Sequence, residues 1–182
     1  MNATPLAIPE IVLLEPKIYG DSRGHFYESY NARTFAAAVG HEVSFVQDNH
    51  SLSQRGVVRG LHYQMAPAPQ GKLVRVIAGE IFDVAVDIRK SSPTFGKWVG
   101  EILSAANKRQ LWIPVGFAHG FMALRDNTEV LYKATDFYHR VAEQSIRWDD
   151  PALAIDWPAG ATPVLSEKDA IAPGFADAAI FD

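Results

Sequence analysis

Short apolar or alternating segments, set between turn residues, fill the chain from residue 43 to about residue 138. They recur at spacings of roughly 8 to 12 residues, as strands do in an antiparallel sandwich or barrel. The pattern therefore predicts an all-β fold. The clearest segments are KLVRVIA (72–78), IFDVAVDI (81–88), KWVGEIL (97–103), QLWIP (110–114), GFMAL (120–124) and EVLYKATDF (129–137).

The first two of these segments meet at Gly79 and Glu80. Glycine supplies the positive φ angle that a tight turn needs, so we expect a β-hairpin there. A short surface helix is expected at ARTFAAAVG (32–40), with Asn31 or Thr34 as its N-cap and the closing glycine as its C-cap. Peripheral helices should be few and short.

The chain after residue 148 is rich in Pro, Asp and Ala. This composition favours turns, with room for one more short helix, over long strands. We find no internal repeat, low-complexity tract or linker. The sequence therefore predicts a single domain over residues 1–182.

Composition and charge limit the kinds of molecule that the protein is expected to bind. The 182 residues are 48% hydrophobic and carry a net charge of -4, which argues against a nucleic-acid or anionic membrane surface and favours a small-molecule partner. There is no cysteine, hence no disulfide and no thiolate site, which suits a reducing compartment. The first apolar run is broken by Pro9, Glu10 and Glu15, so we expect no signal peptide or membrane span and a cytoplasmic location.

The segment VVRGLHYQ (57–64) reads as a strand with unusual polar residues. Strict alternation directs Arg59 and His62 to opposite faces, because they are three positions apart. His62 alone is as easily a core histidine as a functional one. Its neighbourhood favours function, since Arg59, Lys72 and Arg75 would place three cations on adjacent strands, and buried cations are rare without an anion to hold.

Two further residues are ambiguous when taken alone. His119 lies among glycines and aromatics in PVGFAHGF (114–121), and for that segment alone a turn histidine bonded to backbone is the favoured explanation. Tyr132 shares a strand face with Val130 and Ala134, as a core tyrosine would.

A metal site is disfavoured, because Gln64, a poor ligand, stands where a second ligand beside His62 would point. Neither a phosphate-binding glycine loop nor a G-x-S-x-G serine motif is present.

Several motifs, in order along nearly the whole chain, closely resemble those of the cupin-fold dTDP-4-dehydrorhamnose 3,5-epimerases. That resemblance implies a metal-free, cofactor-free jelly-roll barrel in a homodimer, with a dTDP-sugar as substrate. The matching segments are GDSRGHFYE (20–28), QDNHSLS (47–53), RGLHYQ (59–64), the K-x-V-x-V start at Lys72, IPVGFAHGF (113–121), VLYKATDFY (130–138), DPALAIDWP (150–158) and LSEKD (165–169).

The resemblance also implies roles for individual residues. It makes His62 the general base, Asp169 its orienting carboxylate, Tyr132 the acid on the opposite ring face and Lys72 the cation near the developing enolate. Substrate contacts fall to two groups: Arg59, His119, Gln47 and Asn49 toward the sugar or diphosphate, and Arg23, Phe26, Glu28, Tyr138, Glu143 and Lys168 toward the nucleotide or the rim. It further suggests that N-terminal strands are exchanged, which would place Arg23 and Phe26 in the partner's site.

The chemistry fits these residue types. The C4 ketone of the substrate flanks C3 and C5, so loss of either proton delocalises charge onto one oxygen, and protonation of the far face inverts the centre. For Arg59 and His62 to serve one pocket, Gly60 must permit a bulge or bend that resets the alternation between them.

Three rival functions stay open. They are an epimerase acting at C3 only or C5 only, a non-catalytic cupin that binds a sugar nucleotide, and a metal-dependent cupin oxygenase or isomerase.

Overall fold

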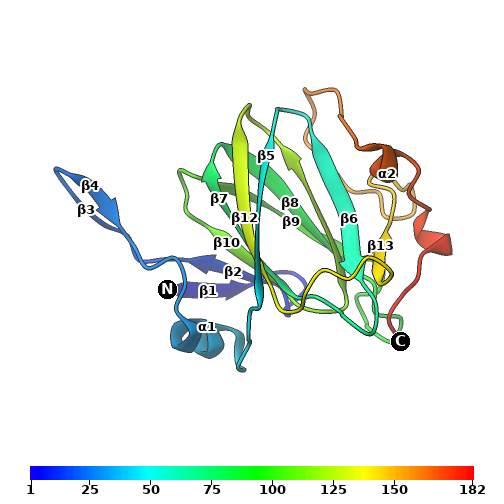
Figure 1. Ribbon diagram of the computed structural model, residues 1–182, viewed down its shortest axis with the longest axis horizontal. Coiled ribbons are helices and arrows are strands. Elements are labelled where there is room, and N and C mark those ends of the chain that lie inside the picture. Colours follow the sequence, from blue (N-terminus) through cyan, green and yellow to red (C-terminus); the bar gives the residue numbers. More distant parts are fainter.

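The computed structural model describes all 182 residues and is built mainly of antiparallel strands (Figure 1). A six-stranded sheet has the order β1-β2-β10-β7-β12-β5, and a five-stranded sheet has the order β13-β6-β11-β8-β9. The all-β, jelly-roll-like architecture is therefore confirmed. The strands are β1 (Asn2–Pro5), β2 (Val12–Glu15), β3 (Tyr19–Asp21), β4 (Gly24–Phe26), β5 (Gln47–Ser53), β6 (Val58–Gln64), β7 (Lys72–Ala78), β8 (Glu80–Asp87), β9 (Trp98–Ser104), β10 (Gln110–Ile113), β11 (Phe117–Ala123), β12 (Thr128–Ala134) and β13 (Glu143–Ser145).

The main core lies between the two sheets. It is a cluster of 14 buried residues, to which the six-stranded sheet contributes Val74 and Val130 and the five-stranded sheet contributes Ile81 and Phe121. Each fully buried side chain of this kind stabilises the fold by about 1.5–3 kcal/mol. Alternate residues of the strands thus hold the sheets together, and the remaining residues face outward.

Helix α1 (Ala32–Val39) covers one end of the outer face of the six-stranded sheet. The Asn31 side chain accepts hydrogen bonds from two backbone N–H groups of the first turn, and Gly40 ends the helix in the left-handed region. Asn31, rather than Thr34, is therefore the N-cap. The fully buried Phe35 ring packs edge-on against Trp112, which fixes the helix on the sheet.

The C-terminal segment covers the outer face of the five-stranded sheet (Figure 1). Its aromatic residues, including Trp157 and Phe181, pack against buried Leu61 and Ile146. This segment contains turns, helix α2 (Glu167–Ala170) and a 3-10 turn (Phe175–Asp177), as its composition predicts. Helix α2 lies beside β6, where Asp169 contacts His62.

The expected hairpin at Gly79 is wrong. Strand β7 pairs with β10 and β12, whereas β8 pairs with β9 and β11, so the chain crosses from one sheet to the other at this glycine. Gly79 does have a positive φ of 75°, and a Cβ there would lie 2.3 Å from the Thr128 hydroxyl. The glycine allows a tight corner between layers, because both flanking strands direct apolar residues into the same core.

Strand boundaries differ from the expected ones by a few residues, with two larger differences. Strand β11 begins at Phe117, so His119 lies within a strand and not at its start. Strand β12 ends at Ala134, three residues before the apolar pattern does. The apolar pattern did not place strands β1 to β4 or β13, all of which lie outside residues 43–138.

The predicted irregularity at Gly60 is confirmed. His62 faces His119 in the ladder between β6 and β11, while Arg59 faces Phe121, so two residues of β6, Gly60 and Leu61, oppose the single residue Gly120 of β11. Gly60 has a φ of 124°, and a Cβ there would lie 2.5 Å from the Cα of Gly120. The extra residue resets the alternation between Arg59 and His62.

Strands β3 and β4 pair only with each other and extend away from the two main sheets (Figure 1). All six of their residues are exposed, and 72% of Phe26 is accessible to solvent. An isolated two-stranded hairpin is marginally stable in water. None of the helices has the length and apolar character that a bilayer crossing needs.

Candidate active site

A cavity of about 370 Å³ opens between the two sheets and gathers the polar residues of greatest interest. The five-stranded sheet and α2 line one side, and β7 and β12 of the six-stranded sheet line the other. Six residues expected at the site line this one cavity: Arg59, His62, Lys72, His119, Tyr132 and Asp169.

His62 and Asp169 form a short pair. Nε2 of His62 lies 2.5 Å from an Asp169 carboxylate oxygen, and only 4% of the Asp169 side chain is exposed. The Ser166 hydroxyl donates to the other carboxylate oxygen and also caps α2. Burial alone would raise the pKa of Asp169, but the hydrogen bonds from His62 and Ser166, with the charges of His62 and Lys168, hold it below its usual value. Asp169 is therefore an anion that orients the imidazole.

Lys72 enters the cavity from β7. Its ammonium donates to the backbone carbonyl of His62 at 3.2 Å and lies 6.0 Å from the centre of the Tyr132 ring. Burial lowers the pKa of Lys72 to about 8, against the opposing attraction of Asp83 and Glu143. A buried ammonium with one hydrogen-bonded partner retains donors for a bound oxygen atom.

A second histidine and carboxylate pair faces the first. Nε2 of buried His119 lies 2.7 Å from an oxygen of Asp83, a residue with no exposed surface. The other Asp83 oxygen is buried and has no hydrogen-bond partner. Asp83 was missed in the sequence, although it shares the inward face of β8 with Ile81 and Ala85, where a carboxylate must have a compensating partner.

Tyr132 comes from β12, in the sheet opposite His62. Burial, followed by the negative charge of Glu143, raises the pKa of its phenol. The hydroxyl therefore keeps its proton at neutral pH, as a proton donor requires. Arg59 is anchored by the hydroxyl of Ser53 at 3.0 Å and the carbonyl of Leu52 at 3.1 Å.

The expected residues near the rim form a connected group. The Tyr138 hydroxyl donates to Glu143 at 2.9 Å, and Glu143 pairs with Lys168 at 2.6 Å. The Gln47 amide donates to Asn49 and accepts from the backbone N–H of Tyr138. These residues do not line the cavity itself. However, β5 carries Gln47 and Asn49, α2 carries Lys168, and both elements also carry residues that do line the cavity.

Arg23, Phe26 and Glu28 are not brought to this cavity within one chain. Arg23 pairs with Asp21 inside the β3–β4 hairpin and is 88% exposed, and Glu28 binds Asn31 before α1. In Figure 1 the hairpin extends away from the two main sheets, between which the cavity lies.

The residues around the cavity offer no ready metal site. No group of three or more His, Asp or Glu side chains could hold a metal ion. The Gln64 amide, which stands two residues after His62, bonds only to backbone groups of Ala68, Phe137 and His139.

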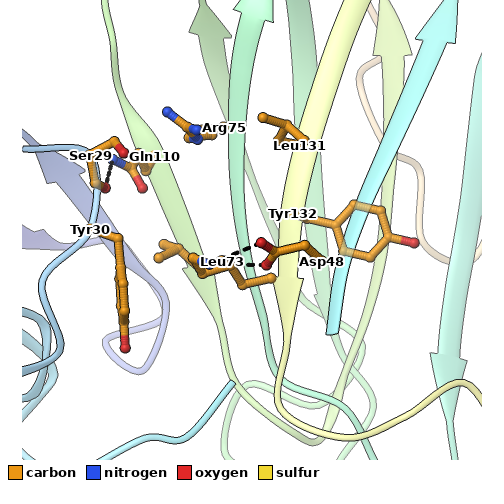
Figure 2. A pocket seen from close by; sticks show the side chains of 9 residues that line it. Ser29, Tyr30, Asp48, Leu73, Arg75, Gln110, Leu131 and Tyr132 are labelled. Atoms are coloured by element: carbon orange, nitrogen blue, oxygen red, sulfur yellow. Dashed lines mark hydrogen bonds and ion pairs between the residues drawn. The ribbon is translucent and has the colours of Figure 1, made fainter. Parts of the chain in front are cut away.

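A second pocket of about 200 Å³ lies on the outer side of β7 and β12 (Figure 2). Arg75 and Leu73 line it, and the ring of Tyr132 points away from them. Arg75 therefore does not join Arg59 and Lys72, contrary to the grouping of cations expected from the strands. This pocket contains no histidine, and of the residues that line the first cavity it shares only Tyr132.

Comparison with known proteins agrees with this geometry. The family model described as dTDP-4-dehydrorhamnose 3,5-epimerase matches residues 5–177. The chain belongs to this family. The Pseudomonas aeruginosa dTDP-4-dehydrorhamnose 3,5-epimerase is 62% identical over 181 residues, covering 100% of this chain and 99% of the relative.

Solved structures of epimerases also superpose closely. A Legionella pneumophila 3,5-epimerase in complex with dTDP-4-keto-L-rhamnose is 57% identical, with a TM-score of 0.93 over 97% of this chain and 93% of that one. A 3'-monoepimerase from Streptomyces bikiniensis in complex with dTDP-quinovose is 35% identical, with a TM-score of 0.89 over 94% of this chain and 87% of that one. The epimerase fold is thus shared by enzymes that differ in the centres they invert.

Proposed function

We propose that this protein inverts C3 and C5 of dTDP-4-dehydro-6-deoxy-D-glucose to give dTDP-4-dehydro-L-rhamnose, without metal or cofactor, on the path to dTDP-L-rhamnose. One observation carries the proposal: His62 and Tyr132 come from facing sheets and line the same cavity. A keto-sugar ring held between them would meet a base on one face and an acid on the other.

His62 acts as the base. Because Nε2 of the ring bonds to Asp169, Nδ1 is the nitrogen left to take the proton from C3 or C5. A positioned general base contributes about 10²- to 10⁴-fold to rate, and the carboxylate stabilises the imidazolium that forms.

Lys72 stabilises the enolate. Removal of either proton places negative charge on the C4 oxygen, and a preorganised donor at such an oxygen contributes about 10²- to 10³-fold. The buried ammonium of Lys72, fixed by its bond to the His62 carbonyl, is suited to this role.

Tyr132 completes each inversion. Its phenol gives a proton to the carbon on the face opposite His62, which collapses the enolate to the ketone. His62 then gives up its proton and Tyr132 regains one from water, so no net proton is consumed.

The diphosphate and nucleotide bind toward the rim. Arg59, His119, Gln47 and Asn49 contact the sugar or diphosphate, for which a planar guanidinium is well suited. Tyr138, braced by Glu143 and Lys168, offers a ring 55% exposed for stacking on thymine.

The functional unit is a homodimer that exchanges its N-terminal hairpins. The exposed β3–β4 hairpin supports this, because Phe26 and Arg23 have no role in their own chain's cavity. Arg23, Phe26 and Glu28 would then complete the nucleotide site of the partner. Mixing the His62→Ala and Arg23→Ala/Phe26→Ala variants should restore activity, up to about one quarter of the wild-type sites if subunits pair at random.

The absence of cysteine supports a reducing compartment, so we propose that the enzyme works in the cytoplasm. We also propose that residues 1–182 form a single domain, because one core joins the two main sheets. The similarity of this chain to a 3'-monoepimerase supports one alternative function, the inversion of a single centre.

Incubation of the 4-keto sugar nucleotide with enzyme in D₂O distinguishes inversion at both C3 and C5 from inversion at a single centre. Deuterium at both C3 and C5 is the expected result. Label at one carbon would favour the alternative, and no label at all would remove the epimerase assignment.

A further inference from the structure

The loop of residues 135–142 carries Tyr138 across the rim, from β12 to β13. Side-chain amides bond to its central backbone groups. Gln64, only 3% exposed, donates to the carbonyl of Phe137 at 3.1 Å and accepts from the N–H of His139 at 2.8 Å. Its remaining amide hydrogen bonds to the carbonyl of Ala68. The Gln64 side chain therefore bonds to the loop backbone on both sides of Tyr138.

Two further glutamines hold the same segment. Gln47 accepts from the N–H of Tyr138 at 2.9 Å, and Gln70 donates to the carbonyl of Asp136 at 2.7 Å. Four consecutive residues, 136 to 139, are thus bonded by three glutamine side chains from β5, β6 and the segment before β7.

This arrangement fixes the backbone beneath an exposed ring. Neither Phe137 nor Tyr138 is held by burial, since they are 63% and 55% exposed. Only the hydroxyl of Tyr138 is tied, to Glu143. Backbone bonds of Thr135, Ala142 and Glu143 hold the two ends of the loop, but without the glutamines its central backbone would keep only the bond of the Phe137 N–H to the Asp136 side chain. Segments with so few bonds open easily.

We propose that Gln64 is a positioning residue for nucleotide recognition: with Gln47 and Gln70 it sets the loop so that the Tyr138 ring is in place before the base binds. This rests on the proposed function, in which Tyr138 stacks on thymine. Gln64 lies two residues after His62 in β6. The strand that carries the general base therefore also positions the loop that binds the nucleotide.

The expected effect is on binding and not on chemistry. Ordering one mobile side chain on binding corresponds to about a 2- to 12-fold loss of affinity. Gln64→Met, which keeps the size of the side chain and removes its hydrogen bonds, should weaken dTDP binding by about that factor. At saturating substrate, kcat should stay within about twofold, because no contact of His62, Lys72 or Tyr132 changes.

The experiment measures dTDP affinity by calorimetry, together with kcat and KM, for Gln64→Met, Tyr138→Ala and the double variant. Tyr138→Ala should weaken dTDP binding by about 5- to 150-fold, the range for loss of an aromatic ring stacked on a base. If Gln64 acts through Tyr138, the Gln64→Met effect should disappear in the Tyr138→Ala background. Inorganic pyrophosphate, which has no base, should bind all variants alike.

Gln144→Met is the matched control, since Gln144 lies in the neighbouring strand β13 and its amide makes no hydrogen bond. Should Gln64→Met fold poorly, Gln70→Met, which removes a single bond to the loop, should give a smaller effect in the same direction.

If Gln64→Met left dTDP affinity unchanged while Tyr138→Ala weakened it, this inference would be overturned and the proposed function would stand. So would a Gln64→Met effect that persists without Tyr138, or a fall in kcat with affinity intact. Failure of the unaltered protein to bind dTDP would overturn the proposed function and this inference with it.

Discussion

Replacing Lys72 by methionine should stabilise the folded protein while removing most of its activity. Burial holds the pKa of Lys72 at about 8 instead of 10.5. At about 1.4 kcal/mol per pKa unit, keeping this ammonium charged in the folded state costs about 3 kcal/mol. Methionine has a similar length and no charge, and it loses only the hydrogen bond to the His62 carbonyl, worth about 1 kcal/mol. The variant should therefore be about 2 kcal/mol more stable at pH 7.

The pH dependence of this difference follows from the direction of the shift. Between about pH 8 and 10.5 the unfolded chain binds a proton at Lys72 and the folded chain does not. The stability of the wild-type protein therefore rises with pH in this window, relative to the variant. The advantage of Lys72→Met should be complete below about pH 8 and absent above 10.5.

Urea unfolding at equal protein concentration, across this pH range, measures the difference, and the slope m should match in the two proteins. In parallel, kcat should fall about 10²- to 10³-fold, as expected for loss of an oxyanion donor. Lys133→Met is the matched control, because Lys133 lies on the outer face of β12 and pairs with Asp48, and its kcat should not change. A Lys72→Met protein that is less stable at pH 7, or a stability difference that does not vary with pH, would refute the reasoning.

Three other substitutions test the cavity. Asp169→Asn should lower kcat about 10³- to 10⁴-fold with little change in KM, because the neutral amide neither orients His62 nor stabilises its imidazolium; a loss below tenfold in steady-state kinetics would contradict this. Tyr132→Phe should still exchange substrate protons with D₂O at His62, but it should form inverted product at least about 100-fold more slowly. Mass spectrometry measures the exchange and product analysis the inversion. Equal losses in the rates of exchange and of inversion would show that the assignment of Tyr132 is wrong. Asp83→Asn should reduce kcat/KM about 10- to 100-fold, because it removes a charge-assisted bond to buried His119, and wild-type kinetics would exclude that role.

The strands of this fold are readable from the sequence because alternation of polar and apolar residues reports directly on two-sided burial. The ends of α1 are readable for a similar reason, since Asn31 and Gly40 are local signals. The corner at Gly79 is not. A glycine turn looks the same in sequence whether the next strand pairs with the previous one or crosses to the other sheet, and only packing of the core decides between them.

The site is readable to the extent that its motifs resemble a family. Local pattern alone left His62 and His119 ambiguous, because nothing in the sequence shows that they face each other in the ladder between β6 and β11. The role of Asp83 was available in principle, as a carboxylate at a core position of a strand. The place of Arg23 and Phe26 could not follow from local pattern, since their hairpin makes no contact with the cavity of its own chain.

The partner of the His62 imidazole stands 107 positions further along the chain, in the single turn of α2. During synthesis His62 leaves the ribosome long before Asp169 does, and seven strands of the two main sheets, β7 to β13, are made in between. An imidazole held by no carboxylate has no fixed ring orientation, so the nascent protein can complete its sandwich and still be unable to abstract a proton. On the proposed mechanism, turnover must therefore wait until the segment that carries α2 has docked, which makes catalysis a late property of the folding chain.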